Sequence, residues 1–396
     1  MKQFEQDPTD PAFVQDPYAA YARARAEGAI LYWPAYGMPA AFSHETVDAL
    51  LRDRRLGREA PAGALPAPPE RLAPFYRIED NSMLELEGKR HARLRGLVMR
   101  AFTSSRVTAL RAPIHALCMD LCTDIAERLQ EGPVDVLDAY CRPLPVTIIA
   151  RLLGVPDTDA DQLLAWSNAM VGMYQAGRTR AMEDAAAAAS TEFAAYLQGP
   201  IAQKRQSPKD DLFSALIAAR DAQDKLSEAE LIATAILLLN AGHEATVHAL
   251  GNTIAAVLRT GHRGNWDNIA EEGMRYDPPL HLFTRWVYED VEIAGVTLPA
   301  GSQVACMLGA AARDPEAWPN PDSFSPERFA TRTAAQTAFG AGRHFCIGAP
   351  LARLEMAIAL EVLFEQLPDL ALAAPVQYAP IYHFHGLSAV QVRLGP

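Results

Sequence analysis

A glycine-rich segment beside a helix start constrains this chain more than any other feature. Residues 339–348 read F-G-A-G-R-H-F-C-I-G, and the apolar positions from Leu351 to Val362 are spaced for one helical face. Pro350 falls in the first turn of that predicted helix, where a missing N–H costs nothing. Cys346 therefore precedes a helix N-terminus, whose backbone N–H groups and positive end stabilise a thiolate.

The glycines around this cysteine narrow the chemistry. Gly340, Gly342 and Gly348 let the backbone turn sharply and approach a flat object closely. One thiolate on such a loop suits a haem iron better than zinc, which requires several clustered ligands. A buried, inert cysteine is the usual role of a lone Cys, but it does not account for the surrounding loop.

The segment resembles the haem loop of the cytochrome P450 haem-thiolate enzymes, F-G-x-G-x-H-x-C-x-G. The fixed positions of that loop are met here by Phe339, Gly340, Gly342, His344, Cys346 and Gly348. The resemblance implies that Cys346 is the proximal ligand of the iron of haem b, and that dioxygen is a co-substrate. Thiolate donation raises the electron density on iron and favours O–O cleavage.

Further motifs follow in the order of that family. His91 and Arg95 lie four apart on one predicted helical face, and the resemblance assigns them, with Arg285 and His344, to the haem propionates. Each alone would more often be a solvated surface charge.

A second motif, E-x-x-R, is met by Glu272 and Arg275, and Arg328 in S-P-E-R-F completes the family's Glu–Arg–Arg network. The resemblance gives this network a structural role behind the cysteine loop. Because losing one partner of a buried ion pair costs about 3–5 kcal/mol, these residues are expected to govern haem retention.

A long helix is predicted from Ser227 to Thr260, about 50 Å at 1.5 Å per residue, and Ser227 with Glu230 forms a capping box at its start. Its centre, A-G-H-E-A-T, resembles the family's A-G-x-(E/D)-T-T. The resemblance makes Ala241 and Gly242 haem contacts and places Glu244, Ala245 and Thr246 in the catalytic region.

Ala245 departs from the family, which has a threonine there for proton delivery. Three replacements are open: Thr246, an extra ordered water, or a hydroxyl on the substrate. Asn240, Glu244 and His248 recur at i, i+4 spacing, and this stripe either carries protons or contains a self-satisfied Glu–His pair. We hypothesise that substrate-assisted or water-mediated protonation replaces the missing threonine.

The predicted fold class is mainly α with small β-sheets. The resemblance implies the cytochrome P450 fold, a triangular helical domain with haem between the long central helix and the cysteine-loop helix, as one domain over residues 1–396. Strands are expected near 28–60, 287–306 and 375–396, and helices over 90–275 and 349–367. Residues 291–306 read as a hairpin, with turns at Ala294 and Pro299. Residues 61–77 read as a long loop, and the connection 259–272 is shorter than the family's.

Composition excludes several classes of protein. Lys plus Arg number 36 against 48 Asp plus Glu, a net charge of −12, which argues against nucleic-acid binding through a globally basic surface. Five scattered cysteines do not form a secreted disulfide pattern, and Cys118 with Cys122 read as small core residues. Without a signal core or an apolar stretch long enough to span a bilayer, the chain is expected to be soluble, cytoplasmic and free of membrane contact.

The resemblance also implies a substrate pocket and redox partners. Pocket segments are 166–174, 238–245, 280–283 and 383–387, with the loop around Phe75. The expected lining residues are Phe75, Tyr76, Met170, Leu238, Ala241, Ala245, Leu282, Phe283 and Phe384. Polar candidates are Arg77, Arg178, His281 and His385. A ferredoxin or flavodoxin with its NAD(P)H reductase is expected to dock on a basic patch of Arg100, Arg106, Arg111, Arg343 and Arg353.

The leading interpretation is a monooxygenase that inserts one atom of dioxygen into a small, largely apolar substrate by hydroxylation, O-dealkylation or epoxidation. Ala245 leaves open a haem-thiolate enzyme that uses peroxide or performs oxidative coupling or desaturation. A non-catalytic haem sensor or carrier is a third class, against which the retained Glu244 argues.

Overall fold

The computed structural model describes residues 1–174, 178–218, 220–221, 224–331, 334–382 and 384–395. The chain divides into two compact units. The first, here termed the mixed unit, comprises Met1–Pro61, Ile114–Arg142 and Ala245–Pro396. The second, the helical unit, comprises Ala62–Pro113 and Pro143–Glu244. The single-domain organisation expected over residues 1–396 stays a prediction.

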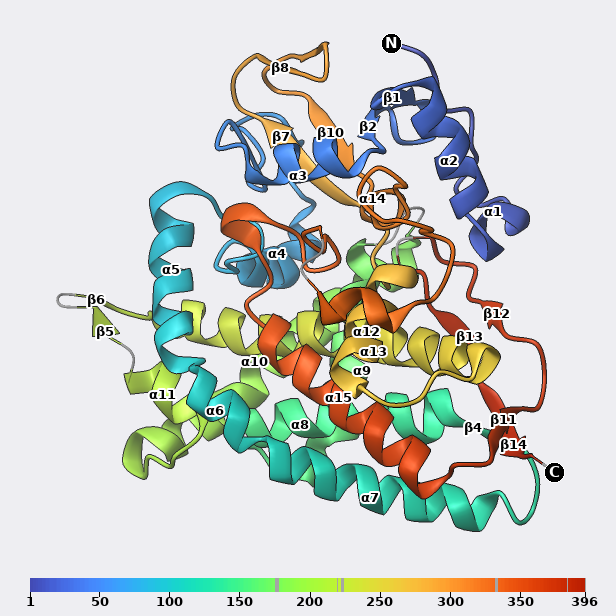
Figure 1. Ribbon diagram of the computed structural model, residues 1–396. Coiled ribbons are helices and arrows are strands. Elements are labelled where there is room, and N and C mark those ends of the chain that lie inside the picture. The colour runs from blue at the N-terminus through green and yellow to red at the C-terminus, as the bar shows by residue number, and fades with distance from the viewer. Residues whose placement is uncertain (175–177, 219, 222–223, 332–333, 383, 396) are drawn as a thin grey trace. The chain divides into compact units, whose positions relative to one another are not determined.

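A five-stranded sheet organises the mixed unit (Figure 1). Its strands, in spatial order, are β1 (Ile30–Trp33), β2 (Met38–Ala41), β10 (Gln303–Cys306), β7 (Phe283–Val287) and β3 (Leu56–Gly57). β10 runs parallel to β2, and the other neighbouring pairs are antiparallel.

Side chains alternate between two apolar cores along these strands, as strand geometry requires. Leu31 and Ala305 join a core with Tyr21, whereas Ile30 and Val304 join a second core. Because both faces of the sheet are buried, the strands read as short apolar runs and not as apolar–polar alternation.

The hairpin predicted over residues 291–306 is confirmed at its first turn, whereas Gln303–Cys306 joins the five-stranded sheet. β8 (Val291–Ile293) pairs antiparallel with β9 (Val296–Leu298). Ala294 and Gly295 have φ of 50° and 72°, the left-handed conformation of a two-residue hairpin turn. The remaining strands of this unit are β4 (Val134–Asp135), β11 (Leu370–Leu372), β12 (Gln377–Tyr378), β13 (Leu387–Ala389) and β14 (Gln391–Leu394).

Helices complete the mixed unit. α13 packs against α15 and against the short turn Pro326–Ala330. The helices are α1 (Pro11–Gln15), α2 (Tyr18–Glu27), α3 (His44–Arg52), α13 (Trp266–Tyr276), α14 (Leu308–Ala312) and α15 (Ala349–Gln366). A π-helical turn spans Leu137–Cys141.

The helical unit contains α4 (Ala73–Glu79), α5 (Gly88–Ala101), α6 (Ser104–Ala109), α8 (Pro143–Leu153), α9 (Ala160–Val171), α10 (Arg180–Gln206) and α11 (Leu212–Ala218). It also holds the two short strands β5 (Arg220–Asp221) and β6 (Asp224–Lys225). Two helices, α7 (Arg111–Arg128) and α12 (Glu228–Thr260), contribute residues to both units. Within the helical unit, α10 packs against α9 and α4.

The capping box predicted for the long helix is confirmed. The backbone N–H of Ser227 donates to Glu230 Oε2 at 2.9 Å, and the N–H of Glu230 donates to Ser227 Oγ at 3.2 Å. Each residue thus satisfies an otherwise unpaired N–H at the helix start. α12 ends at Thr260, and the short connection to α13 leaves only residues 261–265 outside helices.

The predicted loop over residues 61–77 is wrong in its second half. A short 3-10 turn spans Glu70–Leu72, and α4 follows directly. Pro74 lies in the first turn of α4, where proline is compatible with a helix. Among the described residues, no helix is long and apolar enough to cross a membrane.

Candidate functional site

The loop that carries Cys346 is held by its own backbone. The N–H of Cys346 donates to the carbonyl of Phe339 at 3.0 Å, and the N–H of Gly340 donates to the carbonyl of Thr337 at 2.8 Å. α15 begins at Ala349 with Pro350 in its first turn, as predicted. A Cβ added at Gly348 would lie 3.7 Å from Cys346 Sγ, so the sulfur lies at the N-terminal end of α15.

Two glycines of this loop are required by their conformation and their neighbours. Gly340 and Gly342 both have φ of 69°, which side chains rarely adopt. A Cβ at Gly342 would lie 2.5 Å from the carbonyl oxygen of Leu51, at the end of α3. A Cβ at Gly340 would lie 3.3 Å from the ring of Phe283 on β7. The loop is therefore seated against α3 and β7 of the same unit.

Cys346 differs from the other cysteines in its exposure. It is exposed, whereas Cys118, Cys122, Cys141 and Cys306 are buried. Burial raises the pKa of Cys118 to about 12 and those of Cys122 and Cys306 to about 11, and it raises the pKa of Cys141 further. The prediction that Cys118 and Cys122 are core residues is confirmed. Of the five sulfurs, only that of Cys346 is placed to meet a ligand.

Arg353 connects the cysteine loop to α13. Its guanidinium lies 4.5 Å from the centre of the Phe339 ring and forms an ion pair with Glu271. Gln336 also donates to Glu271, at 3.1 Å. Arg353 was expected on a surface for redox partners, but these contacts show that it also holds the loop against α13.

The next residue of α13, Glu272, is the centre of a buried ion network. Arg275 Nε lies 2.7 Å from Glu272 Oε2, and both side chains are fully buried. Arg328 Nε approaches the same carboxylate at 3.1 Å, and the N–H of Ser325 donates to Oε1 at 2.6 Å. The remaining guanidinium nitrogens of Arg275 donate to the carbonyls of Ala312, Pro321 and Ser323. Both charges of the central pair are thus matched.

Burial disfavours the charged form of the arginine in this network. Desolvation lowers the pKa of Arg275, and the hydrogen bond to Glu272 opposes that effect. A buried guanidinium stays charged only while its carboxylate partner is present. The structure therefore brings together the three residues that the sequence placed in one network.

The centre of α12 has one open face. Leu238, Ala241, Gly242 and Ala245 recur at helical spacing, and Ala241 is exposed while the other three are half-buried. Their neighbour Leu239 is fully buried. An exposed alanine in the middle of a 33-residue helix marks a face that the described side chains leave uncovered.

Gly242 has a further explanation within the helical unit. A Cβ at this position would lie 2.8 Å from Cδ1 of Ile149 on α8. The resemblance assigns Gly242 to haem approach, and helix packing also requires a small residue there. Ala249, further along α12, is buried.

The polar residues of this region lie in different surroundings. Glu244 is half-buried and its Oε2 lies 3.6 Å from Nδ1 of the buried His243, its chain neighbour. Asn240 is buried and its amide lies 3.9 Å from Sδ of Met170. Thr246 and His248 are buried as well. The role of the Asn240–Glu244–His248 stripe in proton movement stays a prediction.

The four residues expected at the propionates are divided between the units. His91 is buried and Arg95 half-buried on α5 of the helical unit. Arg285 is buried on β7 of the mixed unit, where it also donates to the carbonyl of Thr284 at 2.9 Å, and His344 is half-buried in the cysteine loop. Arg285 thus lies on the strand against which the cysteine loop packs, and His344 lies in the loop itself.

Several expected pocket residues of the mixed unit are packing residues. Leu282 is buried in the core that contains Tyr21, because alternation along the chain turns it to the opposite side from Phe283. Phe283 is half-buried and contacts the cysteine loop. Phe384 is half-buried, with its ring centre 6.3 Å from that of His248. His383 lies outside the described residues.

The aromatic residues expected in the pocket from the helical unit form their own contacts. Phe75 is buried on α4, and its ring meets those of Tyr76 and Tyr174 edge-on at 5.4 and 6.3 Å. Met170 is fully buried on α9. Arg178, a polar candidate for the pocket, is partly exposed and ion-paired with Glu183 at 3.0 Å.

His281 and His385 were expected to offer polar contacts to a substrate. Both are almost fully buried and lie beside Asp277, with their ring centres 4.3 Å apart. Their sequence gave no signal for this cluster, since the two histidines are more than a hundred residues apart and match no motif.

Comparisons with known proteins give a consistent result. A family model described as cytochrome P450 matches residues 266–368. The chain is 38% identical over 387 residues to cytochrome P450 107B1 of Saccharopolyspora erythraea, covering 92% of this chain and 91% of that protein. It is 36% identical over 354 residues to the mycinamicin IV hydroxylase/epoxidase of Micromonospora griseorubida, covering 86% and 85%.

Solved structures agree with these relatives. The crystal structure of P450BioI in complex with an acyl carrier protein ligated to hexadec-9Z-enoic acid superposes with a TM-score of 0.89 at 29% identity. The match covers 97% of this chain and 99% of that chain.

Proposed function

We propose that this chain, which belongs to the cytochrome P450 family of monooxygenases, uses Cys346 as the thiolate ligand of haem b and inserts one oxygen atom into a small, largely apolar substrate. One observation carries the proposal: among five cysteines, Cys346 alone is exposed, on a glycine loop at the start of a helix. The haem iron of this family supplies the activation of dioxygen.

The residues present fit a flat cofactor. Gly340 and Gly342 adopt a backbone conformation that brings the loop close to its neighbours without side chains, and Cys346 Sγ lies on the exposed side of this loop. Ala241, exposed at the centre of α12, offers a second surface without bulk. A planar ring system requires such surfaces, whereas a metal ion alone requires clustered ligands.

Charged donors suited to carboxylates accompany these surfaces. We assign Arg285 and His344 of the mixed unit to the propionates, since both lie on segments adjoining the cysteine loop. His91 and Arg95 on α5 are assigned the same role from their motif. Guanidinium groups are the donors best matched to carboxylate geometry.

Proton delivery is assigned to the region of α12 around Ala245. A methyl group can neither donate a proton nor hold a water, so the hydroxyl that the family places at this position is missing. Glu244 is half-buried and so retains access to a proton source. We propose that Glu244 acts through an ordered water or a substrate hydroxyl, with Thr246 the other candidate.

The substrate class is inferred from the apolar side chains of α12 and β7. Leu238, Ala241 and Phe283 are incompletely buried and carry no polar group. We therefore propose a small organic substrate that is held by apolar contact and oxidised by hydroxylation, O-dealkylation or epoxidation. A relative named hydroxylase/epoxidase supports oxygen insertion over other outcomes.

Electrons are proposed to come from NAD(P)H through a ferredoxin or flavodoxin and its reductase. Two of the five basic residues expected to receive that partner also form ion pairs within the protein. Arg353 is engaged by Glu271 and Phe339, and Arg106 is paired with Asp210 at 3.0 Å. Arg111 is exposed and is the residue at which charge reversal tests docking.

Ala245 favours one second candidate, a haem-thiolate enzyme driven by peroxide or performing coupling or desaturation. Product formation with hydrogen peroxide alone, compared with NADH, ferredoxin and ferredoxin reductase, separates the two. Faster turnover with the redox chain supports the monooxygenase, and turnover with peroxide only supports the alternative.

A spectral screen of small organic compounds tests the substrate proposal. Apolar compounds are expected to displace the water bound to the iron and to convert the haem from low spin to high spin. Compounds that produce this change are then incubated with the redox chain, and their oxygenated products are measured. A screen in which only charged, polar compounds bind would contradict the proposed substrate class.

A further inference from the structure

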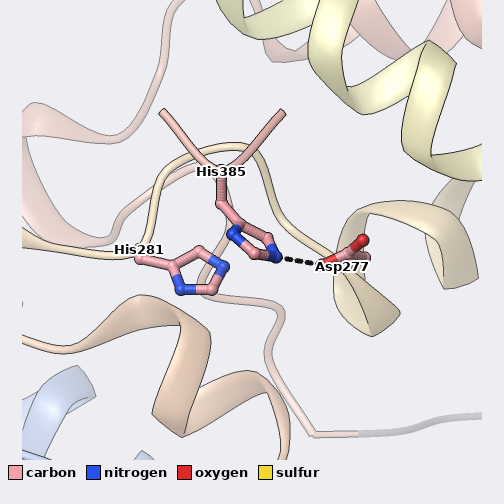
Figure 2. A group of neighbouring side chains, drawn as sticks. All are labelled: Asp277, His281 and His385. Carbon is pink, nitrogen blue, oxygen red and sulfur yellow. Dashed lines mark ion pairs between the residues drawn. The ribbon is translucent and has the colours of Figure 1, made fainter. Parts of the chain in front are cut away.

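Three buried side chains from three segments meet inside the mixed unit. Asp277 ends α13, His281 lies in the link from α13 to β7, and His385 lies between β12 and β13 (Figure 2). They are 2%, 0% and 1% exposed. Their potential ligand atoms all lie within 4.8 Å of one another, which among the described residues holds for this group of three alone.

Several nitrogen atoms of this cluster have no hydrogen-bond partner. His281 Nε2 and both ring nitrogens of His385 are buried and unpartnered. His385 Nε2 lies 3.4 Å from Asp277 Oδ1, as the dashed line in Figure 2 marks, but it is not hydrogen-bonded there. Native proteins rarely leave buried polar atoms unsatisfied, and three of them on two adjoining rings point to an absent ligand.

The other atoms of the cluster are held in place by tyrosines. Tyr21 Oη lies 2.8 Å from His281 Nδ1, which leaves Nε2 as the nitrogen of that ring able to bind a ligand. Tyr18 donates to Asp277 Oδ1 at 2.6 Å, and Tyr378 donates to Oδ2. Metal ligands in proteins are typically oriented by such outer hydrogen bonds.

A glycine in the neighbouring backbone leaves room for the His281 ring. A Cβ added at Gly309 would lie 2.8 Å from His281 Nδ1, so only glycine leaves room for this ring. The ring of Tyr378 stacks on that of His385 at 3.9 Å with the planes 13° apart. Both imidazoles therefore have fixed positions.

The charges around the cluster suit a cation. Arg313 is the nearby cation, but its guanidinium is paired with Asp322 at 2.9 Å. The carboxylate of Asp277 thus remains the charge that faces the two rings.

We propose that Asp277, His281 and His385 bind a divalent transition-metal ion, with Zn²⁺ as the expected occupant, at a site separate from Cys346. Two imidazoles and one carboxylate form a ligand set that zinc accepts. Metal–ligand distances of about 2.0–2.1 Å place tetrahedral ligand atoms about 3.4 Å apart, so the side chains must move by less than about 1 Å. The ion ties the end of α13 to the segment before β13.

Zinc content of the intact haem protein tests this proposal. Tag-free protein is produced in zinc-supplemented medium, passed through gel filtration with EDTA, and analysed for zinc and iron by mass spectrometry. We expect one zinc per chain. The double variant His281→Gln/His385→Gln is expected to lose at least about nine-tenths of it. His115→Gln, at an exposed histidine of α7, is the matched control and should keep its zinc.

Zinc K-edge X-ray absorption of the wild-type protein decides the question even if the double variant does not fold. The account predicts two imidazole nitrogens and one carboxylate oxygen at about 2.0–2.1 Å from zinc. Tyr21→Phe keeps all three ligands and is expected to weaken zinc affinity about 10-fold to 100-fold in competition with a chelator. Wild-type protein without zinc, a shell without imidazole, or a double variant with unchanged zinc overturns the proposal.

Discussion

The cysteine loop and the Glu272 network belong to the same unit and are connected through Arg353, yet they are built in opposite ways. The loop is held by backbone hydrogen bonds and glycine conformations, and its key side chain, Cys346, is exposed. The network is held by side-chain charges, and Glu272 with Arg275 is fully buried with every charge matched.

This difference separates chemistry from stability. An atom that must meet a cofactor has to be accessible, so little packing energy depends on it. A buried ion pair has no access to a cofactor, but removing one partner leaves an uncompensated charge. Substitutions in the loop are therefore expected to change the ligand chemistry, and substitutions in the network the free energy of unfolding.

Cys346→Ser should have the largest effect. A hydroxyl is a far weaker iron ligand than a thiolate, so we expect product formation to fall at least about a thousandfold, about 4 kcal/mol in the activation free energy. The melting temperature of the haem-free protein should change by less than about 3 °C, since the side chain is exposed there. Turnover and thermal unfolding are measured together. A variant that keeps its activity would show that another group binds the iron.

Arg275→Ala should act mainly on folding. Loss of one partner of the buried pair is expected to lower the free energy of unfolding by about 3–5 kcal/mol, measured by urea denaturation. Arg52→Ala removes an exposed i, i+4 pair with Asp48 and serves as the control, with an expected loss of about 0–1 kcal/mol. Equal losses in the two variants would remove the distinction between the network and an ordinary surface pair.

Glu355 is buried like Glu272, but among the described residues it lacks the ion pairs with arginine that Glu272 forms. It lies on α15, its Oε1 has no hydrogen-bond partner, and burial raises its pKa from 4.5 to about 8. The folded protein keeps this proton while the unfolded chain loses it, so stability should fall as pH rises from about 4.5 to about 8.

Between pH 5 and 7, Glu355 is expected to lower the free energy of unfolding by about 2–3 kcal/mol. Glu355→Gln should remove this part of the pH dependence, as measured by urea denaturation at each pH, whereas Glu365→Gln, at an exposed position of the same helix, should leave it unchanged. A wild-type stability that rises between pH 5 and 7 and is unaffected by Glu355→Gln would contradict the assignment.

Ala245→Thr should give the smallest effect. It should change the efficiency of the reaction and leave stability unchanged. The new hydroxyl displaces the water or substrate group that we propose to deliver protons, so the product formed per NADH consumed should fall by about twofold or more. Ala245→Val has the same bulk without the hydroxyl and separates steric from proton effects. If Ala245→Thr binds substrate normally and leaves the ratio unchanged, the proposed substitute for threonine loses its support.

The sequence predicted those parts of the structure that depend on local patterns. The capping box at Ser227, the hairpin turn at Ala294 and the helix that begins after Cys346 each follow from a few neighbouring residues. The Glu272–Arg275–Arg328 contacts could be predicted because the family's motifs connect residues that are distant in the chain. α4 was missed because the segment 61–77 is rich in proline and alanine and reads as a loop, although proline in a first turn is compatible with a helix.

Features that depend on long-range packing were not predictable. Leu282 and Phe283 are neighbours of similar character, and only the sheet assigns them to opposite cores. The meeting of His281 and His385 beside Asp277 depends on how the segment before β13 returns to the end of α13, for which one sequence carries no signal. The packing of Ile149 against Gly242, which also requires a glycine there, depends on long-range packing in the same way.

The central claim is that the sulfur of Cys346 binds a haem iron as a thiolate. The most direct measurement is the absorption spectrum of the purified protein after reduction under carbon monoxide. The account predicts the red-shifted Soret band of a thiolate-ligated haem in the wild type and its absence in Cys346→Ser. A band at the position of a histidine-ligated haem, or protein that purifies without pigment, would contradict it.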